Sequence, residues 1–111
     1  MTKADKTKLS SNFSIEKAHT AQQLLSKRVI CKDNLSKTIR YVGGVDVAYC
    51  EDICIGAAAV LHFNSFALIE SQTACCKTKF PYIPTLLSFR EISPSFLATK
   101  KLQVLPDVFL V

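Results

Sequence analysis

The chain has 111 residues, of which 49% are hydrophobic, so it is long enough for one domain with a modest core and too apolar to be disordered. Its best candidate for a membrane span, 53–63, is about half as long as a spanning helix needs to be. The net charge of +5 comes from residues 1–40, which hold nine Lys/Arg and three Asp/Glu, and this excess fits either contacts with a phosphate backbone or a solvated helix and tail.

The chain begins with a polar, basic segment. Residues 1–13 contain no hydrophobic block, so we predict a flexible tail, no secretory signal and a cytoplasmic location. Ser14 is a suitable helix N-cap. Apolar residues then recur at spacings of three and four, which predicts a helix at about 14–31 with one apolar stripe: Ile15, Ala18, Ala21, Leu25 and Val29. Residues 14–111 are predicted to form a single domain.

Three strands are predicted next, at 39–49, 53–63 and 66–76. Short turns at 51–52 and 64–65 separate them, which indicates an antiparallel meander. The second strand is a continuous apolar run, as is typical of a strand buried on both faces. We therefore expect both faces of the second strand to be covered.

Helical signals follow the meander. We predict a short helix at about 86–91 and a second one at about 94–103, with Ser93 as its N-cap and Pro94 as its first residue. The pair Leu105-Pro106 ends this helix. A fourth strand is predicted at 107–111.

The five cysteines do not form a recognisable metal or disulfide pattern. Their number is odd and no signal peptide precedes them, which argues against a disulfide framework. None of the spacings is C-x-x-C, and the adjacent Cys75 and Cys76 would point to opposite faces of a strand. We interpret Cys31, Cys50, Cys54, Cys75 and Cys76 as small buried thiols.

Asp46 is unusual because it lies in the middle of the predicted strand "GGVDVAY" (43–49). Aspartate is disfavoured in strands, and an uncompensated buried carboxylate is costly. Alternation places Asp46 on one face with Val42, Gly44 and Ala48, whose small side chains leave open space beside it. Such a carboxylate usually has a metal, an arginine or solvent as its partner, and the residues alone do not choose among these.

A rigid segment precedes the second candidate carboxylate. Pro81 and Pro84 bracket Tyr82 and Ile83 and restrict the backbone on both sides. A rigid, exposed aromatic suits stacking on a base or wedging between bases, although a tyrosine packed under a loop has the same pattern. Glu91 follows in this segment, where an ordinary exposed Arg–Glu pair at a helix end is the simpler interpretation.

Four segments together resemble one family, endonuclease V, the repair nucleases for deaminated purines. "PYIPTLLSFRE" (81–91) resembles the family hallmark, and "GGVDVAY" (43–49) resembles its first-strand motif. "AQQLLSKRVICKDN" (21–34) is similar to the helix before that strand, and "PDVFLV" (106–111) is similar to the strand that leads into the family's V-D-G-x-G motif. Order and spacing agree, and the resemblance covers about 14–111.

The resemblance implies an α/β, ribonuclease-H-like mixed sheet whose fourth strand lies parallel to the first. It also implies Mg²⁺- or Mn²⁺-dependent hydrolysis of the second phosphodiester 3′ to deoxyinosine in DNA repair, which leaves a 5′-phosphate. Asp46 and Glu91 match the family's catalytic, metal-binding carboxylates. The residues that match the wedge beside a flipped-out base are Pro81, Tyr82, Ile83 and Pro84.

The chain departs from the family after Val111, where the aspartate of V-D-G-x-G would follow. We therefore expect 14–111 to be the N-terminal part of an endonuclease V domain, with a sheet truncated after the fourth strand. We expect this chain alone to be inactive and to self-associate through its exposed sheet edge. The alternatives are a non-catalytic nucleic-acid-binding fragment and an endoribonuclease directed at inosine in RNA.

Overall fold

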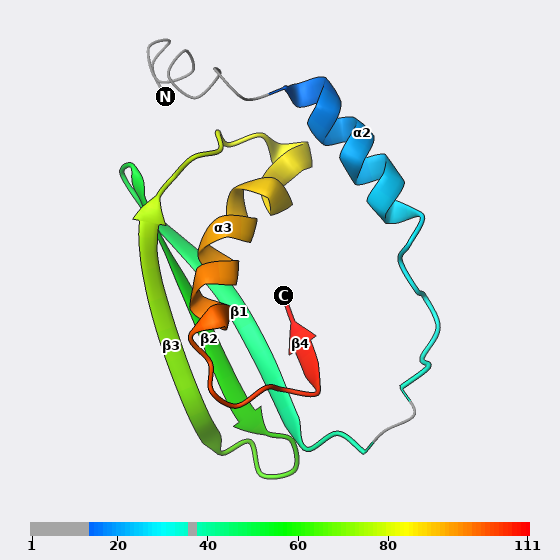
Figure 1. Cartoon of the computed structure of the whole chain (residues 1–111), viewed down its shortest axis with the longest axis vertical. Coiled ribbons are helices and arrows are strands. Elements are labelled where there is room, and N and C mark those ends of the chain that lie inside the picture. The colour runs from blue at the N-terminus through cyan, green and yellow to red at the C-terminus, as the bar shows by residue number, and fades with distance from the viewer. Residues whose placement is uncertain (1–13, 36–37) are drawn as a thin grey trace. The chain divides into compact units, whose positions relative to one another are not determined.

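A computed structural model describes residues 14–35 and 38–111, so the predicted tail at 1–13 lies outside the described residues. The described chain divides into two compact units, one formed by 14–35 with 79–90 and the other by 38–78 with 91–111. The described residues of the first form helical and irregular segments, and the second contains a four-stranded sheet and most of the last helix (Figure 1). Within the described ranges, no helix is long and apolar enough to cross a membrane.

Helix α2 (Ile15–Ser26) opens the first unit. The Oγ atom of Ser14 accepts a hydrogen bond from the amide of Lys17 at 3.2 Å, which confirms the predicted N-cap. The helix ends before the predicted position near residue 31. Val29 and Ile30 are 66% and 69% exposed, so these β-branched residues gain no burial that would offset their poor helix propensity.

The second unit is built on the sheet. Its strands are β1 (Tyr41–Cys50), β2 (Ile53–His62), β3 (Leu68–Lys77) and β4 (Val108–Leu110), in the order β3-β2-β1-β4. β1 pairs with β2 and β2 with β3 in antiparallel fashion, whereas β4 is parallel to β1 (Figure 1). The predicted meander and the parallel fourth strand are both confirmed.

One continuous helix replaces the two helices predicted from the sequence. A 3-10 turn, η1 (Pro84–Leu86), leads directly into α3 (Leu87–Lys100). The predicted boundary at Ser93 is wrong, because Pro94 lies inside the helix. A proline in this position removes one backbone hydrogen bond. Pro94 is also fully buried, and its packing in the second unit offsets that loss.

A seam of small residues brings α3 close to the sheet. A Cβ atom on Gly56 would collide with the carbonyl oxygen of Pro94, so β2 can approach the helix backbone only because position 56 lacks a side chain. Next to this contact, Ala58 of β2, Ala74 of β3 and Ala98 of α3 form a buried cluster. The small core residues therefore position α3 against one face of the sheet.

The opposite face of β2 is open in the described structure. Burial alternates along the strand: Cys54 and Ala58 are buried, whereas Ile53 is 45% and Ile55 is 38% exposed. The expectation that both faces of 53–63 are covered is wrong for the described residues. A continuous apolar run cannot reveal which of its faces has a partner.

The connection between α3 and β4 is held by side chains on both edges of the sheet. On β3, Glu70 accepts from the amides of Gln103 and Val104 at 2.9 Å. At the other edge, Asp107 directly precedes β4, and its Oδ2 atom accepts from the amides of Arg40 and Tyr41 at the start of β1 at 2.8 and 3.0 Å. The amide of Asp107 in turn donates to the carbonyl of Tyr41 at 2.9 Å, so Asp107 fixes the start of β4 against β1.

We expect the free energy of unfolding to depend on pH through the protonation of Glu70. Hydrogen bonds from the side chain of Gln72 and then from the amides of Val104 and Gln103 lower the pKa of Glu70 below its usual value. A lowered folded-state pKa contributes stability that is present above the unfolded-state pKa and is lost as the pH falls through the folded-state pKa. Glu70→Gln should therefore narrow the difference in urea midpoint between neutral pH and about pH 3. An equal difference in both proteins would contradict this role.

Candidate functional site

Asp46 lies on the open face of the sheet. Its side chain is exposed, and its Oδ1 atom accepts a hydrogen bond from the amide of Val47 at 2.8 Å. Register pairs Asp46 with Ala57 of β2 and places both on the face opposite to Val45, which packs against the helix-side core. The predicted small neighbours and open space beside Asp46 are therefore present, and among the partners that the sequence left open, the structure shows contact with solvent.

A hollow of about 540 Å³ lies beside Asp46 on that face. Because Gly44, Ala57 and Ala59 have little or no side chain, the sheet surface is low there. Ser71 and Thr73 of β3 supply hydroxyl groups on the same face, as their pairing with Ala59 and Ala57 requires. Leu110 and Val111 line the hollow from the C-terminal end of β4. The space can therefore accept a ligand next to the Asp46 carboxylate.

Glu91 lies in α3, on the other side of the sheet from Asp46. It is half-buried, and it precedes the buried Pro94 and Ala98 by three and seven residues, which places it on the sheet-facing side of the helix. Asp46 thus projects from the sheet face opposite to the one that α3, the helix of Glu91, covers. β4 pairs with β1 only from Val42 to Gly44, so the edge of β1 beyond Gly44 has no partner strand among the described residues.

The described part of the chain contains no group of three or more His, Cys, Asp or Glu side chains that could hold a metal ion. The two predicted ligands, Asp46 and Glu91, carry hard carboxylate oxygens of the type that Mg²⁺ and Mn²⁺ prefer.

The predicted wedge segment belongs to the first unit. Tyr82 is 60% exposed, which confirms the predicted exposure of this ring. Pro84 is the first residue of η1, and Ile83 before it is extended, with φ −127° and ψ 112°, as expected for a residue that precedes proline. Both prolines therefore restrict the backbone that presents Tyr82.

Side chains of the first unit hold this segment in place. The guanidinium carbon of Arg90 lies 5.6 Å from the centroid of the Tyr82 ring, within cation–π range. Phe80 stacks on Phe89 with their centroids 5.8 Å apart. The Nε2 atom of Gln22 donates to the carbonyl of Thr85 at 2.8 Å and so ties α2 to η1.

Sequence reasoning missed two of these contributors. It treated Arg90 only as a neighbour of Glu91, although an arginine eight residues after a tyrosine in a turn-then-helix segment can fold back over the ring. It treated Asp107 only as the start of a strand. No local signal was available for this role, since Asp107 accepts from amides 66 and 67 residues earlier in the chain.

Residues 23–111 match the sequence model of a family described as Endonuclease V. A curated relative, Endonuclease V from Thermofilum pendens, is 40% identical over 104 residues, which cover 94% of this chain and 45% of that protein. The chain thus spans about half the length of the curated relatives it matches.

Solved structures agree in fold. The Endonuclease V structure from Streptomyces avermitilis superposes with a TM-score of 0.78 at 34% identity and covers 90% of this chain and 45% of that one. Endonuclease V from Ciona intestinalis, solved with a 23mer DNA that contains an inosine followed by a ribo-adenosine, gives a TM-score of 0.71 at 31% identity, with 86% and 44% covered. The mixed sheet of this chain is therefore the ribonuclease-H-like sheet of these proteins.

Proposed function

The chain belongs to the endonuclease V family, and from this premise we propose that it supplies the metal-binding carboxylates and the base wedge of a nuclease that cleaves the second phosphodiester 3′ to deoxyinosine. The observation that carries the proposal is the segment 81–91, which combines a rigidly presented, exposed Tyr82 with Glu91 at the start of the sheet-packed part of α3. The biological role would be repair of deaminated adenine in DNA.

The two carboxylates fit a hard divalent cation. Asp46 is exposed beside the hollow, and Glu91 is half-buried on α3. Because they begin on opposite faces, a shared ion requires the Asp46 carboxylate to turn toward the edge of β1 that β4 leaves unpaired beyond Gly44. When bound, Mg²⁺ or Mn²⁺ would activate water and neutralise charge on the leaving oxygen.

The protein groups have separate tasks in this proposal. Asp46 and Glu91 hold negative charge next to the phosphodiester, which keeps a cation and the scissile bond in one place. Tyr82 fills the gap that a flipped-out base leaves in the stack, and Pro81 and Pro84 limit the entropy lost when the ring inserts. Arg90 supports the ring from one face and adds a positive charge near the backbone phosphates.

The substrate assignment is supported by the Ciona intestinalis complex with inosine-containing DNA. In that DNA a ribonucleotide follows the inosine, and this specific observation favours inosine in RNA as the second candidate substrate. Cleavage of matched DNA and RNA oligonucleotides, each with one inosine, distinguishes the two.

The chain alone is expected to show little or no inosine-specific cleavage in Mg²⁺ or Mn²⁺. Two carboxylates leave most of the coordination to water, which gives weak metal binding. A chimera that joins 1–111 to the part of the Thermofilum pendens protein beyond the match should nick inosine DNA. Nicking by purified 1–111 at the rate of the chimera would contradict the expected inactivity, and a folded but inactive chimera would contradict the proposed function.

Tyr82→Ala in that chimera should weaken discrimination between inosine DNA and undamaged DNA. Loss of one stacking aromatic removes about 1–3 kcal/mol, which corresponds to roughly a fivefold to 150-fold fall in the ratio of the two affinities. Phe66→Ala is the matched control, since Phe66 is 69% exposed but lies in the β2–β3 turn. Fluorescence anisotropy measures, for each variant, the ratio of its affinities for inosine DNA and undamaged DNA. An equal fall of this ratio in the two variants would argue against a wedge role for Tyr82.

Two further properties belong to this proposal. The polar N-terminal sequence supports a cytoplasmic location, which imaging of a tagged protein would test. Two copies could associate through the edge of β1 beyond Gly44, which has no partner strand among the described residues, and analytical ultracentrifugation of 1–111 at several concentrations would detect that.

A further inference from the structure

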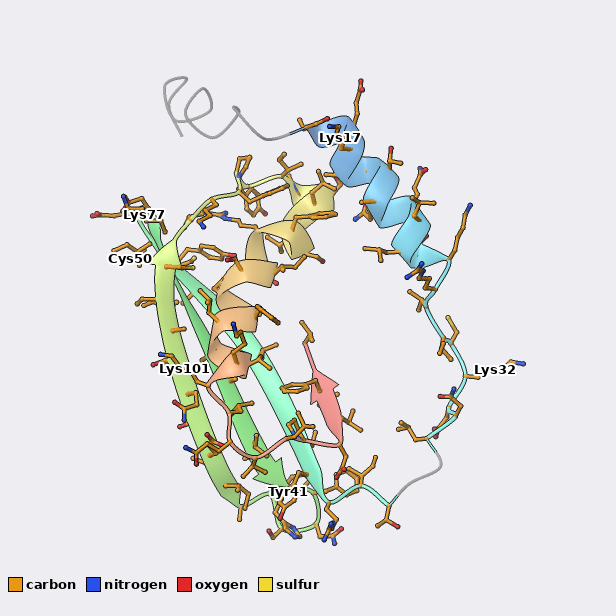
Figure 2. The ribbon with its side chains drawn as sticks, in the orientation of Figure 1. Lys17, Lys32, Tyr41, Cys50, Lys77 and Lys101 are labelled. Carbon is orange, nitrogen blue, oxygen red and sulfur yellow. The ribbon has the colours of Figure 1, made fainter. Side chains whose placement is uncertain are left out.

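Two of the five cysteines lie directly opposite each other in the sheet. The register of β2 and β3 pairs Cys54 with Cys76, and their Sγ atoms are 3.1 Å apart. The Cys54 sulfur also lies 3.3 Å from the carbonyl oxygen of Cys76, so one thiol can donate to that oxygen while the sulfurs remain in contact. The pair lies at the end of the sheet that Cys50 and Lys77 mark in Figure 2.

We propose that Cys54 and Cys76 are an oxidation site that forms a reversible disulfide when the protein meets a peroxide. Directly opposite residues of an antiparallel pair have Cα atoms about 4.5–5.5 Å apart. Disulfides accept Cα separations of about 4.4–6.8 Å, so rotation of the two side chains can join the sulfurs without moving the strands.

The other cysteines lack this arrangement. Register pairs Cys75 with Ile55 and Cys50 with Ile53, so neither faces a cysteine across the ladder. Cys31 belongs to the first unit. The prediction of five buried thiols is also wrong, because Cys31, Cys50 and Cys75 are exposed and only Cys54 is fully buried among them.

Burial sets the order of the two chemical steps. Cys54 is 1% exposed, whereas Cys76 is partly exposed, so the oxidant reaches Cys76 first. The Cys76 thiolate attacks one peroxide oxygen, the O–O bond breaks and hydroxide leaves, which gives a sulfenic acid at Cys76. Cys54 then loses its proton and attacks the Cys76 sulfur, the S–S bond forms and the S–O bond breaks. Two thiols lose two electrons, and the peroxide is reduced to two waters.

The bond would close a loop that contains all of β2 after Cys54 and nearly all of β3. Closing such a loop restricts the unfolded chain and raises stability, whereas cross-strand disulfides that hold strain are readily reduced. The proposed site therefore changes the stability of the sheet with the redox state, independently of any nuclease activity.

The test uses the full chain, treated with hydrogen peroxide, alkylated and digested with Glu-C. Cleavage after Glu51 and Glu70 separates Cys54 from Cys76, so their disulfide appears as a cross-linked pair of peptides in the mass spectrum. We expect this pair in the native protein, its disappearance with dithiothreitol, and a rise in the urea midpoint upon oxidation. The same oxidation of urea-unfolded protein should give mixed pairings.

Three variants make the assignment specific. Cys75→Ser, next to Cys76 but without a cysteine opposite, should keep the cross-link and the rise in midpoint. Cys54→Ala and Cys76→Ser should each lose both effects. Cross-linking through Cys50 or Cys75, disulfides only between chains, or accumulation of sulfinic acid at Cys76 without a cross-link would each overturn the proposal.

Discussion

Replacing Asp46 by asparagine in the chimera is expected to reduce metal-dependent nicking of inosine DNA by about a thousandfold, because the charge that holds the cation contributes several kcal/mol to the transition state. The substitution keeps the shape and the hydrogen bond that the Val47 amide donates at 2.8 Å. The fold should therefore survive. Single-turnover cleavage at increasing Mn²⁺ measures the effect, and high metal should restore part of the rate.

Asp52→Asn is the matched control for Asp46→Asn. Asp52 is an exposed carboxylate in the β1–β2 turn, and its role in the structure is carried by its backbone carbonyl, which accepts from the amide of Thr78 at 2.7 Å. It should cleave at the unmodified rate. If both variants lose activity equally, the loss reflects the change in net charge, and Asp46 has no specific role in holding the cation.

Replacing Gly56 by alanine is expected to cost about 3 kcal/mol in the free energy of unfolding, the upper part of the range for overpacking. The new Cβ would meet the carbonyl group of Pro94 and, at 3.2 Å, the amide nitrogen of Ser95. These are backbone atoms, so no flexible side chain can move away. α3 would have to lift from the sheet, and a urea titration followed by circular dichroism would report the loss.

Gly44→Ala provides the comparison within the same sheet. A Cβ at Gly44 would have the carbonyl oxygen of Leu110 as its nearest atom at 3.8 Å, which is ordinary van der Waals contact. Alanine also restricts the unfolded chain more than glycine does, so the unfolding free energy should change by no more than about 0.5 kcal/mol. Equal losses at both positions would show that the Gly56 seam does not govern the docking of α3.

The sequence predicted the strands well because their signals are local. Turns after Cys50 and His62 and runs of β-branched residues define the meander without reference to the rest of the chain. The parallel position of β4 came from the family resemblance. The continuity of α3 through Pro94 could not be predicted, since it depends on burial of that proline in the second unit.

The candidate site was predicted only in part. Alternation along β1 correctly grouped Asp46 with Val42 and Gly44, and the hollow beside them is present. Which face of the sheet α3 would cover was not readable, because that choice is made by Gly56 and the alanines around it. That Asp46 and the helix of Glu91 lie on opposite faces of the sheet is therefore a tertiary result that spacing along the chain does not contain.

The Asp107 contacts also bear on the order of folding. The meander forms from neighbours in sequence, whereas the Asp107 carboxylate reaches amides 66 and 67 residues away. Closing so long a loop costs conformational entropy. Pairing of a three-residue strand offsets little of that cost. We therefore expect β4 to join last, after α3 has docked on β2 and shortened the effective loop. A nascent chain would hold a complete three-stranded sheet before the strand that borders the hollow arrives.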